Sequence, residues 1–402
     1  MYYAIYIFTF FALVGFFNYH QMLSDQLIKL IFYCVTIVAF ALAITDRRIN
    51  IDKTGYPKTA YNTLMAMLIL SPVMAGIFHG QPLIDSIVTA LSIILAYLWF
   101  YILMKFEISE EKIIRVILIG CAIAVPVYFL NLRAFPGAMF GEQPVEQVRG
   151  ILRLPVVFIE LFPLVLFYAI NRWLISKRPI WIAVIAVCIV MIVISVIRQI
   201  IVVSALMAII FLFRSLNWKQ RALVLVPLLV VAIVIVPRLM VFQALNEVTE
   251  AQQEFNERND QSDIRIQAWK FYTYEYHPNI ATMILGNGYP AIDKTQYGIR
   301  YGADTEAAKC YEADVGWAGF FFFFGAIATV ALFIFMWKAM VRRQPPDRQY
   351  IKYWIAFIII TSVASGPILY TYQIFNVVTV LYLAYAPVQS IHGTDNPQLQ
   401  QR

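Results

Sequence analysis

Apolar runs long enough to form membrane-spanning helices recur along almost the whole chain, and they restrict its fold more than any other feature. There are about twelve of them, and an α-helix needs about 20 residues to cross about 30 Å of hydrocarbon. Only 14% of the residues are charged, against about 25% in soluble domains. The sequence therefore predicts an all-α fold, a polytopic membrane helical bundle of about twelve transmembrane helices. The runs are 2–19, 26–45, 61–78, 86–104, 113–132, 154–171, 179–197, 199–213, 222–237, 313–336, 353–367 and 373–389. The eighth and eleventh runs are short, so one of them is a candidate for a re-entrant or broken helix.

Lysine and arginine are distributed unevenly between alternate loops. If the N-terminus is cytoplasmic, most basic residues fall in cytoplasmic loops, and the loops around 20–25, 79–85 and 368–372 contain none. Basic residues in short loops favour the cytoplasm. We therefore expect both termini to be cytoplasmic and the longest polar segment to be external. The net charge of +7 suits anionic lipid headgroups, and no nucleic-acid-binding motif is present.

One long polar segment interrupts the apolar runs. Loops of this length are usually functional or disordered, so we expect the chemistry to lie here. The segment should contain short helices over 239–257 and 263–276, the second ending before Pro278. Gly286 and Gly288 indicate a turn. The expected organisation is spans one to nine over 1–237, an extracytoplasmic loop over 238–312, spans ten to twelve over 313–389, and a cytoplasmic tail over 390–402.

The second loop helix carries a continuous stripe of one arginine and three aromatic residues at helical spacing. Two interpretations remain open. The stripe anchors the helix flat at the membrane interface, or it forms a wall on which sugars stack beside an arginine that binds phosphate. Its members are Arg265, Trp269, Tyr272 and Tyr276.

Arginines also lie at the predicted outer ends of spans. Arg149 and Arg153 are expected one helical turn apart at the mouth of span six, and Arg198 separates two apolar runs. Guanidinium groups suit the two-point recognition of phosphate, although arginines at these places also serve as membrane anchors. Glu160 is predicted two turns below Arg153. An ionisable group at that depth is a hypothesis for a functional site.

Two acidic residues, Glu312 and Asp314, lie where the chain re-enters the membrane. They either cap the following helix or act as general bases toward a sugar hydroxyl. His277 precedes Pro278, and a structural role is favoured for it over catalysis. The chain contains no HExxH, Walker, DxD or nucleophile-elbow motif, so we expect no metal and no cofactor, and a soluble type of nucleotide-sugar enzyme is disfavoured.

Five short motifs that contain these features follow one another along the chain: RGILRLPVVFIELFP, VIRQIIVVSAL, RIQAW, LGNGYP and DVGWAGFFFFFG. Their order resembles the superfamily of O-antigen polymerases and O-antigen ligases. Ligases carry a histidine near the exit of the late external loop, whereas this chain has no histidine between Pro278 and His392. This departure favours a polymerase. Many members also have Ser-Arg-Gly where this chain has Ile197, Arg198 and Gln199.

The resemblance implies a metal-independent glycosyltransferase of the bacterial inner membrane. It would move a glycan from undecaprenyl diphosphate to another lipid-linked repeat unit, alongside flippase and chain-length regulator proteins. The alternatives are an O-antigen ligase that transfers polymer to the lipid A core of lipopolysaccharide, a flippase or transporter, and an accessory scaffold. The implied diphosphate-binding residues are Arg149, Arg153, Arg198 and Arg265; the candidate bases are Asp314, Glu312 and, with less support, His277; and the residues toward sugar or lipid are Glu160, Trp269 and Tyr272.

Overall fold

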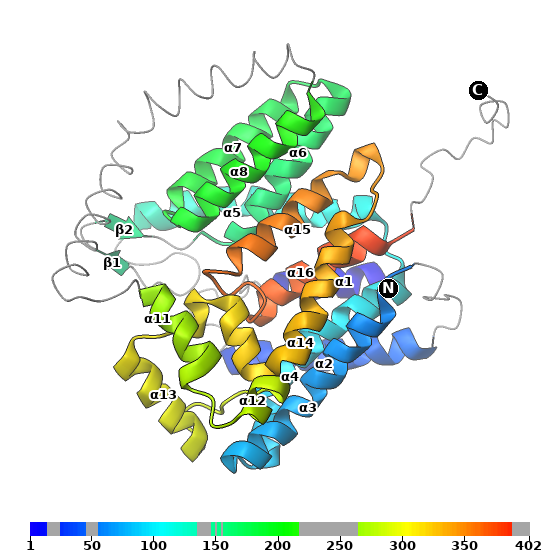
Figure 1. The fold of residues 1–402 in the computed structure, drawn as a ribbon. Coiled ribbons are helices and arrows are strands. Elements are labelled where there is room, and N and C mark those ends of the chain that lie inside the picture. Colours follow the sequence, from blue (N-terminus) through cyan, green and yellow to red (C-terminus); the bar gives the residue numbers. More distant parts are fainter. Residues whose placement is uncertain are drawn as a thin grey trace.

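A computed structural model describes residues 1–13, 25–45, 55–134, 146–148, 151–153, 156–216 and 264–387 (Figure 1). They form a bundle of helices, of which 7 are long and apolar enough to cross a membrane. This confirms the predicted class of a helical membrane bundle. The apolar helices are α1 (Tyr2–Leu13), α2 (Asp25–Thr45), α3 (Lys58–His79), α4 (Leu83–Phe106), α5 (Glu110–Ala134), α6 (Phe162–Ser176), α7 (Ile180–Ile194), α8 (Arg198–Ser215), α14 (Gly316–Val341), α15 (Tyr350–Thr361) and α16 (Thr371–Tyr385).

Every predicted apolar run overlaps one of these helices except 222–237, which lies outside the described residues, as does the predicted helix 239–257. Of the eighth and eleventh runs, one of which was a candidate for a re-entrant or broken helix, the eleventh forms the shorter helix, because α15 ends at Thr361 and is followed by turns. Arg198 begins α8 after a tight turn in which Val196 has a φ of 56°. The apolar stretch around Arg198 is therefore two helices and not one long helix.

The start of span six differs from the prediction. A short antiparallel hairpin, β1 (Glu146–Val148) and β2 (Ile151–Arg153), precedes a 3-10 turn, η3 (Ile159–Leu161), and α6 begins only at Phe162. Pro163 in the first turn of α6 suits a helix start, because an N–H group at that position would have no partner within the helix. Arg153 therefore lies in a strand and Glu160 in a 3-10 turn, so the predicted helical spacing between these two residues is wrong.

The described part of the polar segment folds as short helices. They are α11 (Ile264–Lys270), the π-helix η6 (Phe271–Glu275), α12 (Ile280–Leu285), α13 (Gln296–Ala308) and η7 (Glu312–Asp314). The helix predicted over 263–276 is thus confirmed where the structure describes it. Its last part is a π-helix, closed by the Tyr276 N–H, which donates to the Phe271 carbonyl at 3.0 Å.

Helix α14 is broken at Gly325, which has φ 79° and ψ 172°. An unpaired carbonyl at membrane depth costs several kcal/mol, so unwound backbone needs partners from the protein. The Asn287 and Gly288 N–H groups supply them, donating to the Phe322 and Phe323 carbonyls at 2.9 Å each. Gly286 and Gly288 have φ values of 90° and 78°, which confirms the predicted turn. A Cβ on Gly286 would lie 2.4 Å from the Phe323 carbonyl oxygen.

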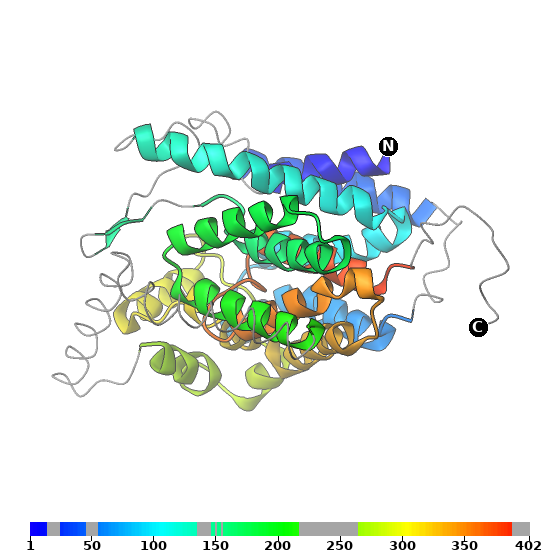
Figure 2. The same cartoon turned by 90° about the horizontal axis from the view of Figure 1, so that it is seen from above.

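The two ends of the bundle carry different parts of the chain. The start of α1 and the end of α16 lie at one end, where Tyr2 stacks on Phe106 at 4.2 Å and the Tyr382 hydroxyl donates to Ile108. At the same end Arg348, in the 3-10 turn η8 (Pro346–Arg348), is salt-bridged to Glu110. Helices α11, α12 and α13 lie at the opposite end in both views (Figures 1 and 2). The helices of the polar segment therefore lie at the end of the bundle opposite to the start of α1 and the end of α16.

Candidate functional site

The turn that follows α15, residues 362–370, is the meeting point of several predicted motifs. It receives the N-terminus of α14, because the Gly316 and Trp317 N–H groups donate to the Ser365 and Ser362 carbonyls at 3.0 and 2.9 Å. From α11, the Trp269 indole N–H donates to the Val363 carbonyl at 2.8 Å. These bonds pair backbone groups that helix ends leave without partners. We refer to residues 362–370 as the site turn.

Helix α8 approaches the same place, since the Gln199 side chain donates to the Thr361 carbonyl at the end of α15. Arg198 is the neighbour of Gln199, and Arg265 lies one helical turn before Trp269. Both arginines are exposed. The fold therefore brings the elements that carry these two arginines to the site turn. Arg149 lies outside the described residues, and of Arg153 the structure describes only its place in β2.

The side-chain hydroxyl groups of two tyrosines, Tyr301 and Tyr272, hold the carboxylate of Glu312 in place. The Tyr301 hydroxyl donates to Glu312 Oε2 at 3.0 Å, and the Tyr272 hydroxyl lies 3.5 Å from the same oxygen. The Tyr272 and Tyr301 oxygens are 3.0 Å apart, and Tyr272 also donates to the Cys310 carbonyl at 3.0 Å. Burial, and after it the charge of Glu312, raises the pKa of both phenols. The phenols therefore stay protonated as donors, and they fix the position of the carboxylate.

The burial of Tyr272 corrects one predicted role. Its side chain is 0% exposed, so it cannot present a stacking face to a sugar. Trp269 is half-buried and directs its N–H into the protein. The predicted stripe also ends early, because the π-helix rotates Tyr276 away from helical register. The Tyr276 hydroxyl donates to the Asp304 carboxylate at 2.6 Å. The aromatic residues of this helix thus hold the loop onto the bundle.

Asp314 lies beside Glu312 in η7 and is half-buried. Its carboxylate makes no side-chain hydrogen bond to the part of the chain that the structure describes. Both carboxylates lie near Tyr370 of the site turn, where burial and then the charges of Glu312 and Asp314 raise the pKa of the phenol. Gly316 permits this packing, because a Cβ there would lie 2.2 Å from the Ser365 carbonyl oxygen. The arrangement offers one engaged and one unengaged carboxylate at the start of α14.

Glu160 reaches the same region from η3. Gln373, in the first turn of α16, donates to its carboxylate and also lies 2.9 Å from the Tyr372 hydroxyl. The Trp354 indole N–H donates to the Glu160 carbonyl at 3.3 Å. Among the side chains that the structure describes, the partner of Glu160 is therefore an amide.

His277 has both ring nitrogens engaged. Its Nε2 donates to the Tyr272 carbonyl at 2.9 Å, and its Nδ1 lies 3.2 Å from both Thr282 Oγ1 and Asn287 Nδ2. Burial lowers the pKa of His277, which keeps the imidazole neutral. No ring nitrogen is left for proton transfer in this structure. The arrangement favours the structural role over the catalytic one.

Sequence analysis missed the residues that fasten the loop to α3. Asn287 is 0% exposed, and its Oδ1 accepts a hydrogen bond from His79 Nε2 at 2.9 Å. Gln81 accepts from the Ala291 N–H at 2.9 Å and from the Thr295 hydroxyl at 3.0 Å. A signal was present in the uncharged polar residues directly after span three and in an asparagine between two glycines.

The part of the chain that the structure describes contains no group of three His, Cys, Asp or Glu side chains placed to hold a metal ion. The fold and this region together define a helical membrane protein with an acidic and aromatic cluster at one end of its bundle. Comparison of the chain with known protein families gave no match, and comparison with curated proteins gave none either.

Proposed function

We propose that the chain is a membrane glycosyltransferase, a polymerase of O-antigen or another surface polysaccharide. It transfers a glycan from undecaprenyl diphosphate to a lipid-linked repeat unit. The observation that carries the proposal is the convergence at the site turn: the carboxylates of η7, the start of α8 with Arg198, and α11 with Arg265 all meet there. Three of the motifs that resemble the superfamily, VIRQIIVVSAL, RIQAW and DVGWAGFFFFFG, are far apart in the sequence, yet each contacts the end of α15 or the site turn.

The proposed chemistry needs a base and an anion-binding group. Asp314 or Glu312 accepts the proton of the acceptor hydroxyl as that hydroxyl attacks the anomeric carbon of the donor. The bond to the diphosphate breaks, and undecaprenyl diphosphate leaves with both electrons of that bond. Arg198 and Arg265, together with Arg149 and Arg153, stabilise the departing negative charge without a metal ion. The carrier lipid enters sideways from the bilayer.

The proposed membrane placement has twelve helices, the ninth being 222–237, in the bacterial inner membrane. Both termini are cytoplasmic, and the segment 238–312 is periplasmic. Support comes from the concentration of lysine and arginine at the end of the bundle that carries the termini. Cysteine accessibility tests it. A cysteine at Lys294 should be labelled from outside the cell and one at Arg343 only after permeabilisation, since both positions are exposed. Labelling of the Arg343 position from outside would refute the orientation.

Turnover by the purified protein tests the function. Given a lipid-linked repeat unit in vesicles, a polymerase elongates it. A flippase only moves it across the bilayer, and a scaffold does neither. Elongation that requires this protein supports the proposal, and movement without elongation refutes it.

A deletion separates polymerase from ligase. Loss of a polymerase leaves cells with single repeat units on their surface, because the ligase still transfers what is available. Loss of a ligase leaves long polymer on the carrier lipid and a bare lipid A core. We expect the first result, since the region from Lys309 to Gly316 contains no histidine.

A further inference from the structure

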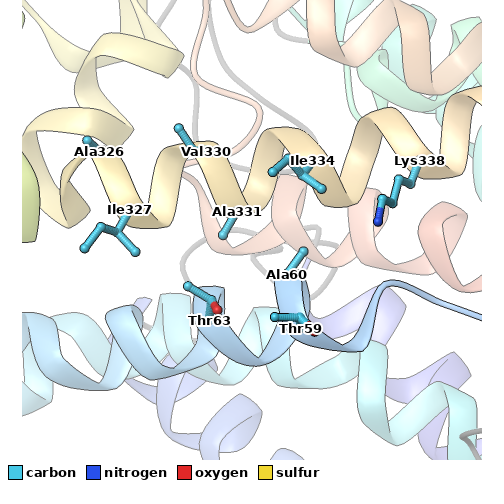
Figure 3. A pocket seen from close by; sticks show the side chains of 9 residues that line it. All are labelled: Thr59, Ala60, Thr63, Ala326, Ile327, Val330, Ala331, Ile334 and Lys338. Carbon is cyan, nitrogen blue, oxygen red and sulfur yellow. The ribbon is translucent and has the colours of Figure 1, made fainter.

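A groove runs between α3 and α14 in the half of the bundle nearer the chain termini, with a volume of about 540 Å³ (Figure 3). Small side chains form its floor, and Figure 3 shows Ala60 and Thr63 of α3 directed toward α14. Branched apolar side chains form the wall on α14, namely Ile327, Val330 and Ile334. Lys338 lies at one end of the groove. The lining is thus almost entirely apolar, with one charge at its mouth.

The groove opens toward the outside of the bundle. Its wall residues Ile327, Val330 and Ile334 are 38%, 55% and 37% exposed. Both helices are candidate membrane spans, so these apolar faces meet hydrocarbon and not water. A groove with this lining, open to the bilayer, fits a lipid chain.

The length of the groove matches a single leaflet. From Ala326 to Lys338, α14 rises about 18 Å at about 1.5 Å per residue. Half of a hydrocarbon core about 30 Å thick is about 15 Å. The groove begins next to the break at Gly325 and ends at the basic end of the helix. An acyl chain of the leaflet on that side therefore fits it.

Charge at the mouth selects the headgroup. Lys338 is exposed, and Lys58 and Arg342 lie at the same ends of α3 and α14. Arg342 lies over the Tyr385 ring at 5.0 Å and donates to the Gly55 carbonyl at 3.4 Å. Neither α3 nor α14 contains an acidic residue. The lining helices therefore provide no anion for Lys338, and a lipid phosphate does.

We propose that this groove binds one anionic phospholipid, with an acyl chain between α3 and α14 and its phosphate at Lys338. Basic pockets between transmembrane helices on the cytoplasmic side bind such headgroups. The site is separate from the site turn and does not depend on the glycosyltransferase activity. With the orientation given above, the lipid belongs to the cytoplasmic leaflet.

Native mass spectrometry of the delipidated full-length protein tests the headgroup. With phosphatidylglycerol or phosphatidylcholine added, wild type should retain one phosphatidylglycerol in preference to phosphatidylcholine. Lys338→Gln keeps a long polar side chain and removes its charge. It should weaken phosphatidylglycerol binding about fivefold and leave phosphatidylcholine unchanged. The matched control is Lys112→Gln, an exposed lysine at the same end of the bundle beside Tyr3, which should bind as wild type does.

A second measurement tests the groove itself. Phosphatidylglycerol with a photoreactive acyl chain should cross-link to α3 and α14 in wild type, and Ala60→Phe, which fills the groove, should abolish the cross-link. If Ala60→Phe does not fold, the wild-type cross-links decide alone. Equal binding of the two lipids, equal losses in Lys338→Gln and Lys112→Gln, or cross-links confined to other helices would each overturn the proposal.

Discussion

The two halves of α14, on either side of Gly325, look alike in sequence but have opposite surroundings. In the outer half almost every side chain from Gly316 to Phe324 is buried, under α12, η6 and η7. In the inner half the exposed side chains include Val330 at 55% and Trp337 at 47%. One half of the helix is therefore covered by protein on nearly all sides, whereas the other half buries one face and exposes an apolar face. The difference teaches that a continuous apolar run can contain both a protein core and an exposed apolar surface, and that the polar side chains of the candidate site gather where protein covers the helix.

The largest effect is expected from the carboxylate at the start of the outer half. Asp314→Asn keeps the size of the side chain and removes the charge, so elongation of a lipid-linked repeat unit should fall at least ~100-fold if Asp314 is the base. Asp293→Asn is the control, because Asp293 is exposed and has a φ of 63° that asparagine tolerates. If Asp314→Asn elongates normally and Glu312→Gln does not, Glu312 is the base. Normal rates in both would remove the carboxylates from the chemistry.

The next largest effect, on thermal stability, is expected from a substitution at the break in α14. Gly325→Ala places a Cβ 2.3 Å from the Ile284 carbonyl at a φ of 79°. Strain of this kind costs about 1–3 kcal/mol, and the clash adds to it. Gly302→Ala is the control, since nothing lies within 4 Å of the added Cβ, and alanine in a helix gains about 0.5–1 kcal/mol over glycine. Thermal unfolding in detergent measures both. Equal stability of the two variants would mean that the outer half of α14 is not held by the loop as described.

Arginine-to-lysine changes sharpen the site further. Arg198→Lys and Arg265→Lys keep the charge but lose the planar fork, so each should reduce elongation about tenfold, or about 1.4 kcal/mol. Arg300→Lys should have no effect, because Arg300 is exposed and its salt bridge is to Asp304, one turn away at 3.5 Å. Rates within twofold of wild type for Arg198→Lys and Arg265→Lys would leave these residues as membrane anchors.

The smallest effect concerns the pH dependence of the loop. Burial lowers the pKa of His277 in the folded protein below its ordinary value of 6.5. The unfolded state therefore binds a proton first, and stability falls as the pH drops through about 6.5. Between pH 7.5 and 5.5 wild type should lose more thermal stability than His277→Asn, while the variant keeps most of its activity at pH 7.5. An identical pH slope for both proteins would show that His277 is not buried as described.

The sequence predicted the apolar helices of the described residues because hydrophobic length is a local property. The glycine turn was equally accessible, since Gly286 and Gly288 need positive φ values. The break in α14 could not be predicted, because FFFFFG is uniformly apolar. The N–H groups that bond the Phe322 and Phe323 carbonyls belong to Asn287 and Gly288, which lie outside α14 in the sequence. Hydrogen bonds from a segment distant in the sequence decide where α14 breaks.

The candidate site was predictable in its residue types but not in its arrangement. Glu312 and Asp314 were found from their place before an apolar run, whereas their phenol neighbours depend on how the loop folds back. Tyr272 was assigned to a sugar by helical spacing, which gives a face but not what covers it. The π-helix from Phe271 to Glu275 also changes the spacing itself. Only contacts between segments distant in the sequence decide whether an aromatic side chain is exposed for stacking or buried as a structural support.

The central claim is that the donor lipid is bound at the site turn, on the protein-covered half of α14. A lipid-linked repeat unit with a photoreactive group beside its diphosphate tests it directly when cross-linked to the purified protein and mapped by mass spectrometry. We predict cross-links to residues 362–370, α11 and η7 that unlabelled lipid-linked repeat unit removes by competition. Cross-links confined to α3 and the inner half of α14, or cross-links that unlabelled substrate does not reduce, would contradict the account.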